Sequence, residues 1–168
     1  EGWLMRCNQS LISHSEFIRS FFTPIVKYSE RIDDLFKSLK RDHEIIVGVM
    51  IRQHDDGPIG EGMFYLDVRD YVKYMMNILD LFGIKKLTFV LTSNAIIHRG
   101  IFRNFSVNYT SNHLMEDIYA LSRCDYIIST PSTFTYWASF WGQVPLCVIE
   151  DNEQKIKLKS FRIYNHLF

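Results

Sequence analysis

The stretch "CDYIISTPSTFTYWASFWG" (residues 124–142) contains one complete transition from strand to helix. Residues 125–129 form a short apolar run that is typical of a buried strand. In the joint that follows, Thr130 is a suitable helix N-cap and Pro131 a suitable first helical residue. The next segment has an apolar stripe at helical spacing, which we expect to bind the helix to a sheet: Phe134, Trp137, Ala138 and Trp141.

The rest of the chain repeats this alternation. Short apolar runs predict further strands at 44–51, 86–93, 105–109 and 144–149. Helices are predicted around Phe17–Phe22 and, in shorter form, at 95–102 and 112–122. A longer helix is expected to have Thr23 as its cap and Pro24 as its first residue, and to bury Ile25. Another is expected from Asp67 to Gly83, with an apolar stripe formed by Val68, Val72, Met75, Leu79 and Phe82. This order predicts a three-layer α/β/α Rossmann-like domain with a mainly parallel sheet.

Composition limits the size and the partners of this domain. At 168 residues and 47% hydrophobic, the chain fits one globular domain or half of a two-lobed protein. We expect a single domain over residues 1–168, with a linker and leading helix at 1–23 and a tail at 150–168. Nineteen basic and nineteen acidic residues balance, so nothing in the net charge favours nucleic acid or an anionic membrane.

Targeting and cysteine signals are weak. No apolar run approaches the roughly 20 residues of a transmembrane helix, and the first residues lack the pattern of a secretory signal. Cys7, Cys124 and Cys147 are widely spaced, which favours buried thiols over disulfides or a zinc site. Sequons at Asn8, Asn104 and Asn108 only leave a secretory origin open.

Polar side chains follow three of the predicted strands, where ligands of parallel sheets bind. After residues 124–129, the N–H groups of Ser132, Thr133 and Phe134 are free at the positive end of a helix, an arrangement that suits a pyrophosphate. Arg52 follows the first strand, and its planar guanidinium matches phosphate oxygens. The alternatives are that Thr-Pro-Ser-Thr only caps a helix and that Arg52 pairs with Asp55 or Asp56.

At these positions the chain resembles the α-1,2-fucosyltransferases of glycosyltransferase family 11. "VGVMIRQHDD" is similar to their first motif, and "LMEDIYALSRCDYIISTPSTFTYWASFWG" to their later one. The resemblance implies the donor-binding half of a GT-B enzyme that transfers fucose from GDP-fucose with inversion and needs neither a metal nor a further cofactor. It also implies a glycan acceptor and a preceding acceptor-binding domain. Either these residues are part of a longer protein, or the chain is a divergent protein that stands alone.

Site roles follow from the same resemblance. It implies that Arg52 holds the GDP phosphates and stabilises the leaving charge, and that Asp55 is the acid of the first motif and a candidate catalytic base. Nucleotide-sugar contacts are expected from Arg52, Asp117, Ser132, Thr133 and Phe134, and also from His54 and Asn94, because these two follow the first and second predicted strands. Alternatives stay open for the charged residues: His54 is solvated, Asp55 only orients Arg52, and Glu116 and Asp117 are surface acids at a helix start.

The chain departs from the family motifs at five positions: Met50, Gln53, His54, Pro131 and Tyr136. Loss of a motif histidine at Met50 and of a second arginine at Gln53 removes polar contacts from the nucleotide cleft. Two rival functions therefore remain, a nucleotide-sugar binder without activity and an interaction domain that has lost the site. No G-x-G-x-x-G follows a strand and no Walker P-loop occurs, which disfavours a dehydrogenase and a P-loop nucleotidase. The expected compartment is the cytoplasm or the membrane periphery of a bacterium, or else the Golgi lumen.

Overall fold

The sheet of this protein is parallel throughout. A computed structural model describes residues 8–53, 66–82, 86–111 and 113–164. Its five strands lie in the order β3-β2-β1-β4-β5, and every neighbouring pair is parallel. Their bounds are β1 Ile45–Ile51, β2 Leu87–Ser93, β3 Val107–Tyr109, β4 Tyr126–Ser129 and β5 Leu146–Val148. The predicted fold class is confirmed.

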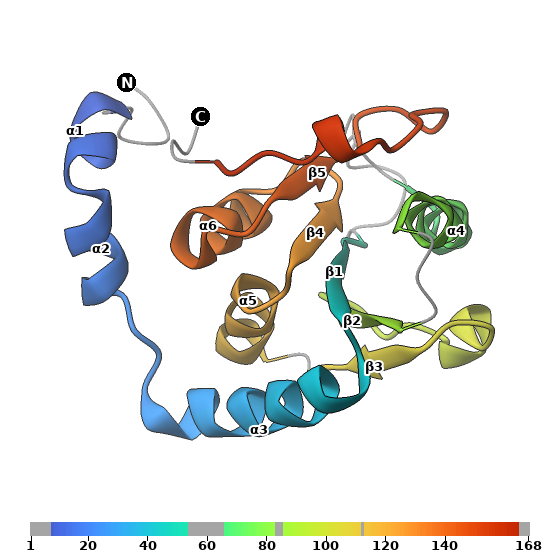
Figure 1. Cartoon of the computed structure of the whole chain (residues 1–168), viewed down its shortest axis with the longest axis horizontal. Coiled ribbons are helices and arrows are strands. Elements are labelled where there is room, and N and C mark those ends of the chain that lie inside the picture. Colours follow the sequence, from blue (N-terminus) through green and yellow to red (C-terminus); the bar gives the residue numbers. More distant parts are fainter. Residues whose placement is uncertain (1–7, 54–65, 83–85, 112, 165–168) are drawn as a thin grey trace.

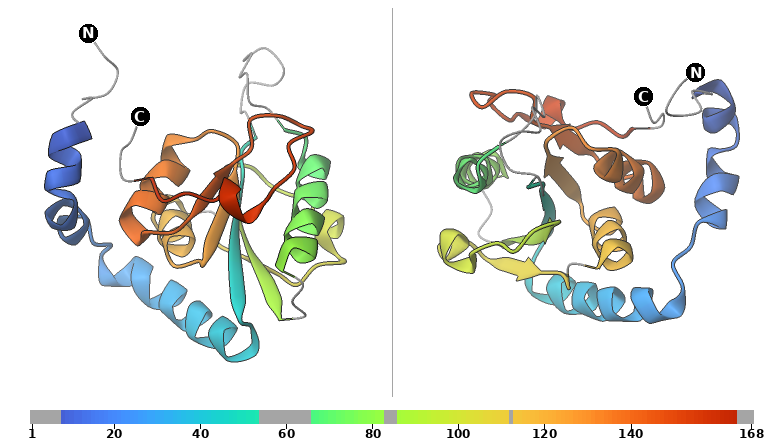
Figure 2. Two further views of the ribbon diagram at one scale, coloured as in Figure 1. Left: turned by 45° about the horizontal axis from the view of Figure 1, so that its top comes forward. Right: turned by 180° about the vertical axis from the view of Figure 1, so that it is seen from behind.

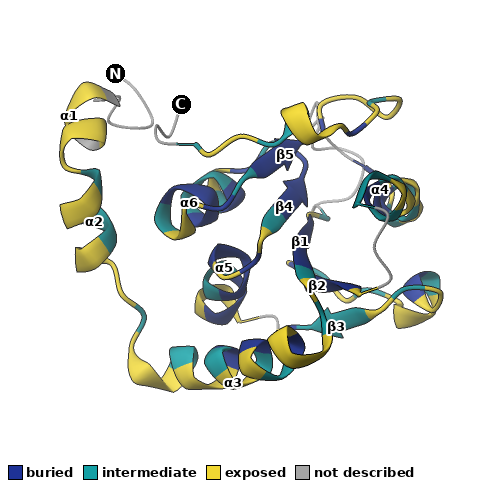
Figure 3. Ribbon diagram, in the orientation of Figure 1, coloured by how far each residue is buried: buried dark blue, intermediate teal, exposed yellow. Residues whose placement is uncertain are grey.

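Helices cover both faces of the sheet (Figures 1 and 2). The α-helices are α1 Asn8–Ser13, α2 Ser15–Phe21, α3 Val26–Asp42, α4 Val68–Phe82, α5 Leu114–Ser122 and α6 Thr133–Gly142, and the short 3-10 helices are η2 Arg99–Phe102 and η3 Leu158–Ser160. One face carries α4 and η2, and the other carries α3, α5 and α6. The α1–α2 arm lies at the periphery and is mostly exposed (Figure 3).

Two apolar cores result, one on each face. In the first, α4 buries Tyr71, Tyr74, Met75 and Ile78 against the sheet. This buried face differs from the predicted stripe. Of the predicted residues only Met75 is buried, whereas Val68, Val72, Leu79 and Phe82 are half-buried. Both β1 and β2 are buried almost throughout, as expected of central parallel strands.

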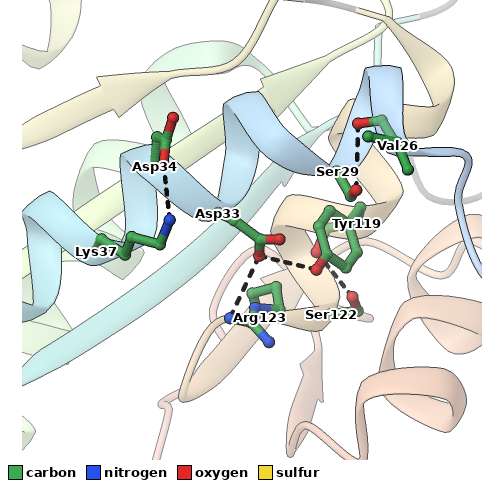
Figure 4. Close-up of polar contacts among 8 residues, drawn as sticks. All are labelled: Val26, Ser29, Asp33, Asp34, Lys37, Tyr119, Ser122 and Arg123. Carbon is green, nitrogen blue, oxygen red and sulfur yellow. Dashed lines mark hydrogen bonds and ion pairs between the residues drawn. The ribbon is translucent and has the colours of Figure 1, made fainter.

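In the second core, α3 packs against α5 with polar contacts at its margin (Figure 4). The Tyr119 hydroxyl donates to Asp33 Oδ1 at 2.9 Å, and Arg123 pairs with the same oxygen at 3.4 Å. These contacts join α3 to the C-terminal half of α5, whereas the first turn of α5 is left for other contacts.

Two helices begin two residues later than predicted. The N-cap of α3 is Ile25, which is extended and 64% exposed rather than buried. The N-cap of α6 is Ser132 instead of Thr130. A proline fixes φ but leaves ψ free, so Pro24 and Pro131 can continue an extended chain. The predicted cap of α4 is confirmed, since Asp67 Oδ1 accepts from Arg69 N at 2.8 Å, whereas Gly83 lies outside the described residues.

The face that α6 turns to the sheet also differs from the prediction. Its buried residues are Thr135, Ala138, Ser139 and Phe140, whereas Phe134, Trp137 and Trp141 are half-buried. The hydroxyls of Thr135 and Ser139 are satisfied locally, by Ser129 Oγ at 2.8 Å and Val144 O at 2.7 Å. Small side chains with satisfied hydroxyls let α6 lie close to the sheet and free the indoles for other contacts.

The remaining segments close the domain. Residues 150–164, within the expected tail, run back along the sheet, and Leu146 of β5 forms an antiparallel bridge with Arg162. Cys124 and Cys147 are free and buried, and burial raises the pKa of the Cys147 thiol to about 11, whereas Cys7 lies outside the described residues. None of the described helices is both long enough and apolar enough to cross a membrane.

Candidate functional site

A cleft of about 320 Å³ opens where the carboxyl ends of the central strands meet α5 and α6. It brings together all the predicted site residues that the structure describes, which come from four separate segments: Arg52, Asn94, Asp117, Ser132, Thr133 and Phe134. His54 and Asp55 lie outside the described residues. Met50, Ser93 and Leu114 also line the cleft; Leu114 was not anticipated, because an apolar side chain at a helix start gives no sequence signal of a ligand.

The first turn of α6 supplies hydrogen-bond donors to this cleft. Ser132 makes no side-chain cap, and its carbonyl accepts from Thr135 N at 3.1 Å and Tyr136 N at 3.0 Å. Within the described chain, the N–H groups of Thr133 and Phe134 have no partner. Free N–H groups at the positive end of a helix favour an anion.

Arg52 adds a positive charge to the same cleft. It directly follows β1, its side chain is exposed, and it forms no ion pair with any carboxylate in the described ranges. Its predicted alternative partners, Asp55 and Asp56, are not among those residues. The guanidinium and the α6 N-terminus therefore combine two cationic features in one cleft, which suits a ligand with more than one anionic oxygen.

Asn94 lines the cleft, but both polar atoms of its side chain hydrogen-bond the protein backbone. Its Oδ1 accepts from Gln53 N at 2.8 Å, and its Nδ2 donates to Gln53 O. The Gln53 amide itself donates to Arg52 O at 3.2 Å and to Leu66 O at 3.3 Å. Nearby, the sulfur of Met50 accepts from the Thr92 hydroxyl at 3.1 Å. Both departures from the motif, Gln53 and Met50, thus have internal contacts in place of polar groups free for a ligand.

Asp117 is a predicted nucleotide-sugar contact that lies buried at the cleft. It is 6% exposed, and one carboxylate oxygen, Oδ1, has no hydrogen-bond partner in the described chain. Burial raises the pKa of Asp117 to about 6, Glu116 adds to the shift, and the Thr110 hydroxyl opposes it. A buried carboxylate oxygen without a partner is costly, so its presence indicates donors supplied by a ligand.

Glu116, the neighbouring acid, has partners of its own. The Ser111 hydroxyl donates to Glu116 Oε2, and Arg31 lies 3.7 Å from the same oxygen. Both acids are buried, so the alternative that they are surface acids at a helix start is wrong. Of the two, only Asp117 lines the cleft.

An apolar groove of about 330 Å³ adjoins the cleft and shares Leu114 and Phe134 with it. It lies between the arm, α5 and α6, and its other lining residues are Phe22, Thr23, Met115, Ile118, Trp137 and Trp141. Trp137 meets Phe22 edge to face, with ring centroids 5.2 Å apart, and Trp141 Nε1 donates to Arg19 O at 3.1 Å. The aromatic stripe of α6 therefore faces the arm.

Two of the solved structures that resemble this chain contain a guanine nucleotide. FUT1 of Arabidopsis thaliana, solved with GDP, is 12% identical with a TM-score of 0.55 over 76% of this chain and 34% of that chain. POFUT1, solved with GDP-fucose, is 13% identical with a TM-score of 0.51 over 69% of this chain and 44% of that chain. The likeness shows that this chain shares its parallel α/β fold with part of each of these two proteins. The chain spans less than half the length of either neighbour.

The narrower resemblance to family 11 stays a prediction. No protein-family model matches the chain, and a comparison with curated proteins gave no match. At such low identity, the two structural neighbours show the fold and leave the reaction to be argued from the site.

Proposed function

We propose that this domain binds a GDP-sugar, with GDP-fucose the expected donor, as the donor half of an inverting glycosyltransferase that requires no metal. One observation carries the proposal: free helix N–H groups, the Arg52 guanidinium and the unpartnered Asp117 carboxylate oxygen line the same cleft. A nucleoside diphosphate has the complementary parts, an anionic pyrophosphate and a base. The GDP and GDP-fucose complexes of the two neighbours add support from proteins of this fold.

The choice of guanine rests on Asp117. Guanine carries adjacent N–H donors on its Watson–Crick edge, whereas adenine has a ring acceptor at the corresponding position. An ionised carboxylate only accepts hydrogen bonds, so it pairs with guanine and repels the adenine acceptor. In this proposal the pyrophosphate lies against Ser132, Thr133, the Phe134 N–H and Arg52.

The proposed reaction needs stabilisation of a leaving group. When the sugar–phosphate bond breaks, negative charge develops on the GDP oxygens, and Arg52 with the α6 N-terminus stabilises it. An acceptor hydroxyl then attacks the sugar from the opposite face, which inverts its configuration. We assign Asp55 as candidate base on the resemblance and His54 as a ligand contact on its place after the first predicted strand, because neither is among the described residues. The glycan acceptor and its preceding domain are part of this proposal.

A second candidate is nucleotide-sugar binding without transfer. It is favoured by Gln53 and Met50, whose polar atoms bond to Arg52 O and Thr92, respectively, where the family motif has a second arginine and a histidine. With fewer groups to stabilise the leaving charge, binding can persist without catalysis. Release of free sugar or transfer to a glycan in the presence of GDP-fucose would separate the two candidates.

Calorimetric titration tests the proposal directly. GDP, GDP-fucose and GDP-mannose are titrated into the folded protein, with ADP and UDP as controls. We expect GDP and at least one GDP-sugar to bind and both control nucleotides to bind more weakly. Failure of every guanine nucleotide to bind folded protein would contradict a donor domain and leave an interaction domain that has lost its site.

A further inference from the structure

Tyr71 carries a buried hydroxyl that the fold does not satisfy. The side chain is 0% exposed, and its Oη has no hydrogen-bond partner among the residues described. Tyr74, three residues further along α4, is equally buried, but its hydroxyl donates to Asp151 O at 2.7 Å. Two tyrosines of one helix therefore differ in one respect, namely that only Tyr74 has a partner.

The unpartnered hydroxyl lies close to two segments that lead to residues of the cleft. Burial raises the pKa of Tyr71, and the Thr130 hydroxyl and the backbone of Arg52 and Thr130 are near enough to oppose that shift, although none of them meets hydrogen-bond geometry. Thr130 follows β4 and Arg52 follows β1, and these strands are paired up to Met50 and Ser129. The tyrosine thus approaches, from the α4 face, both segments that supply the cationic features of the cleft.

Alternation along β4 fixes which way Thr130 points. Ser129 turns toward α6, where its hydroxyl bonds Thr135, so the next side chain turns toward α4. Two residues later, Ser132 is the N-cap residue of α6. A shift of Thr130 toward Tyr71 is therefore transmitted along two peptide units to the free N–H groups of the helix.

Such a hydroxyl has a cost that phenylalanine would avoid. A buried hydroxyl without a partner loses its bonds to water and gains nothing in return, and phenylalanine has nearly the same shape. Orphaned polar atoms in folded proteins call for an explanation, which is commonly a role in function. Here the closeness of Tyr71 to Thr130 and Arg52 suggests such a role in ligand binding.

We propose that Tyr71 is a positioning residue whose hydroxyl pairs with the Thr130 hydroxyl once an anion occupies the N-terminus of α6. The inference rests on the proposed function, because the anion is the pyrophosphate of GDP. In the free protein the hydroxyl is unpaired, and binding completes the hydrogen bond and fixes Thr130 and, through it, Ser132. Tyr71 touches no ligand itself.

The test compares Tyr71→Phe with the matched control Tyr74→Phe. We expect Tyr71→Phe to raise the Tm of the free protein by about 2–4 °C, because it removes an unsatisfied group. The same variant should bind GDP about three- to tenfold more weakly, as loss of one net hydrogen bond predicts. Tyr74→Phe should lower Tm, because it removes the hydrogen bond to Asp151 O, and should leave GDP affinity unchanged.

A double-mutant cycle with Thr130→Val identifies the partner. If Tyr71 acts through Thr130, the double variant loses no more GDP affinity than either single variant. Additive losses would overturn the pairing, and so would an unchanged affinity or a lowered Tm in Tyr71→Phe. If the wild-type protein binds no GDP, the proposed function and this inference both fall. Binding that Tyr71→Phe retains in full overturns the inference alone.

Discussion

The Asn94 side chain holds the backbone of Gln53 by two hydrogen bonds that run in opposite directions. Its oxygen accepts from Gln53 N at 2.8 Å while its amide nitrogen donates to Gln53 O. Because Asn94 follows β2 and Gln53 lies two residues beyond β1, the pair joins two adjacent strand ends. Arg52 lies between β1 and this joint, so its position in the cleft depends on it.

Asn94→Ala should therefore destabilise the protein by about 1–2 kcal/mol, since it removes both side-chain hydrogen bonds to the Gln53 backbone. Urea denaturation measures the change, and amide hydrogen exchange should show faster exchange at Gln53. Asn104→Ala is the control, because Asn104 is exposed, and we expect it to change stability by less than about 0.5 kcal/mol. Equal stability of the two variants would contradict the bridge.

Arg52→Ala should weaken GDP binding about 10- to 100-fold, the range expected when a charged hydrogen-bonding group is lost from a phosphate site. Arg52→Lys should lie between the variant and the wild type, because it keeps the charge and loses the planar fork. Calorimetry measures both. Arg103 is exposed and lies outside the cleft, so Arg103→Ala should bind GDP as the wild type does.

Asp117 should make folding stability depend on pH. Its pKa is raised from an ordinary 3.8 to about 6, chiefly by burial. Between about pH 4 and about pH 6 the folded protein holds a proton that the unfolded chain releases, so stability falls as pH rises through that window. The shift corresponds to about 3 kcal/mol. Asp117→Asn should show a smaller fall in denaturation experiments across this range, and an unchanged fall would assign the effect elsewhere.

Asp117→Asn should also reduce the preference for GDP over ADP by about tenfold or more, because an amide can pair with either base. In the wild type, GDP binding should weaken as pH falls below about 6, since the protonated carboxyl accepts fewer hydrogen bonds. Competition titrations of the two nucleotides provide the measurement. Glu116→Gln is the control, because Glu116 is buried beside Asp117 yet does not line the cleft, and it should keep the preference.

Gly142→Ala should destabilise the protein by more than about 3 kcal/mol. An added Cβ would collide with the backbone carbonyl of Ser122, which closes off any space between the ends of α5 and α6. Gly100→Ala is the comparison, because its Cβ would meet only the side chain of His98 at 2.8 Å, and that side chain can move. Thermal unfolding should separate the two variants clearly, and a mild effect at Gly142 would rule out the close approach.

Much of the fold could be predicted because alternating apolar segments determine it. The parallel sheet and the convergence of Arg52 and Ser132 follow from strand order, since carboxyl ends of parallel strands share one edge. Helix starts could not be placed by Thr-Pro pairs, because a proline is also compatible with extended backbone, as Pro24 and Pro131 precede extended N-caps.

The chemistry of single side chains was harder to predict. The sequence pointed to Asn94 as a ligand contact, but only the geometry reveals its engagement with Gln53. Likewise, the sequence does not distinguish Tyr71 from Tyr74, both of which lie outside the predicted stripe of α4, and what separates them is the carbonyl of the distant Asp151, which accepts from Tyr74. Hydrophobicity misplaced the face of α6, since the buried hydroxyls of Thr135 and Ser139 are satisfied by groups outside the helix.

The bridge between Leu146 and Arg162 has a consequence for the behaviour of the protein in concentrated solution. An edge strand with free backbone groups can recruit strands from other molecules and so begin aggregation. At β5 one position of this edge is already paired, because Arg162 exchanges both backbone hydrogen bonds with Leu146, at 2.9 and 3.1 Å. We therefore expect the segment after η3 to hinder self-association, and its removal to increase aggregation.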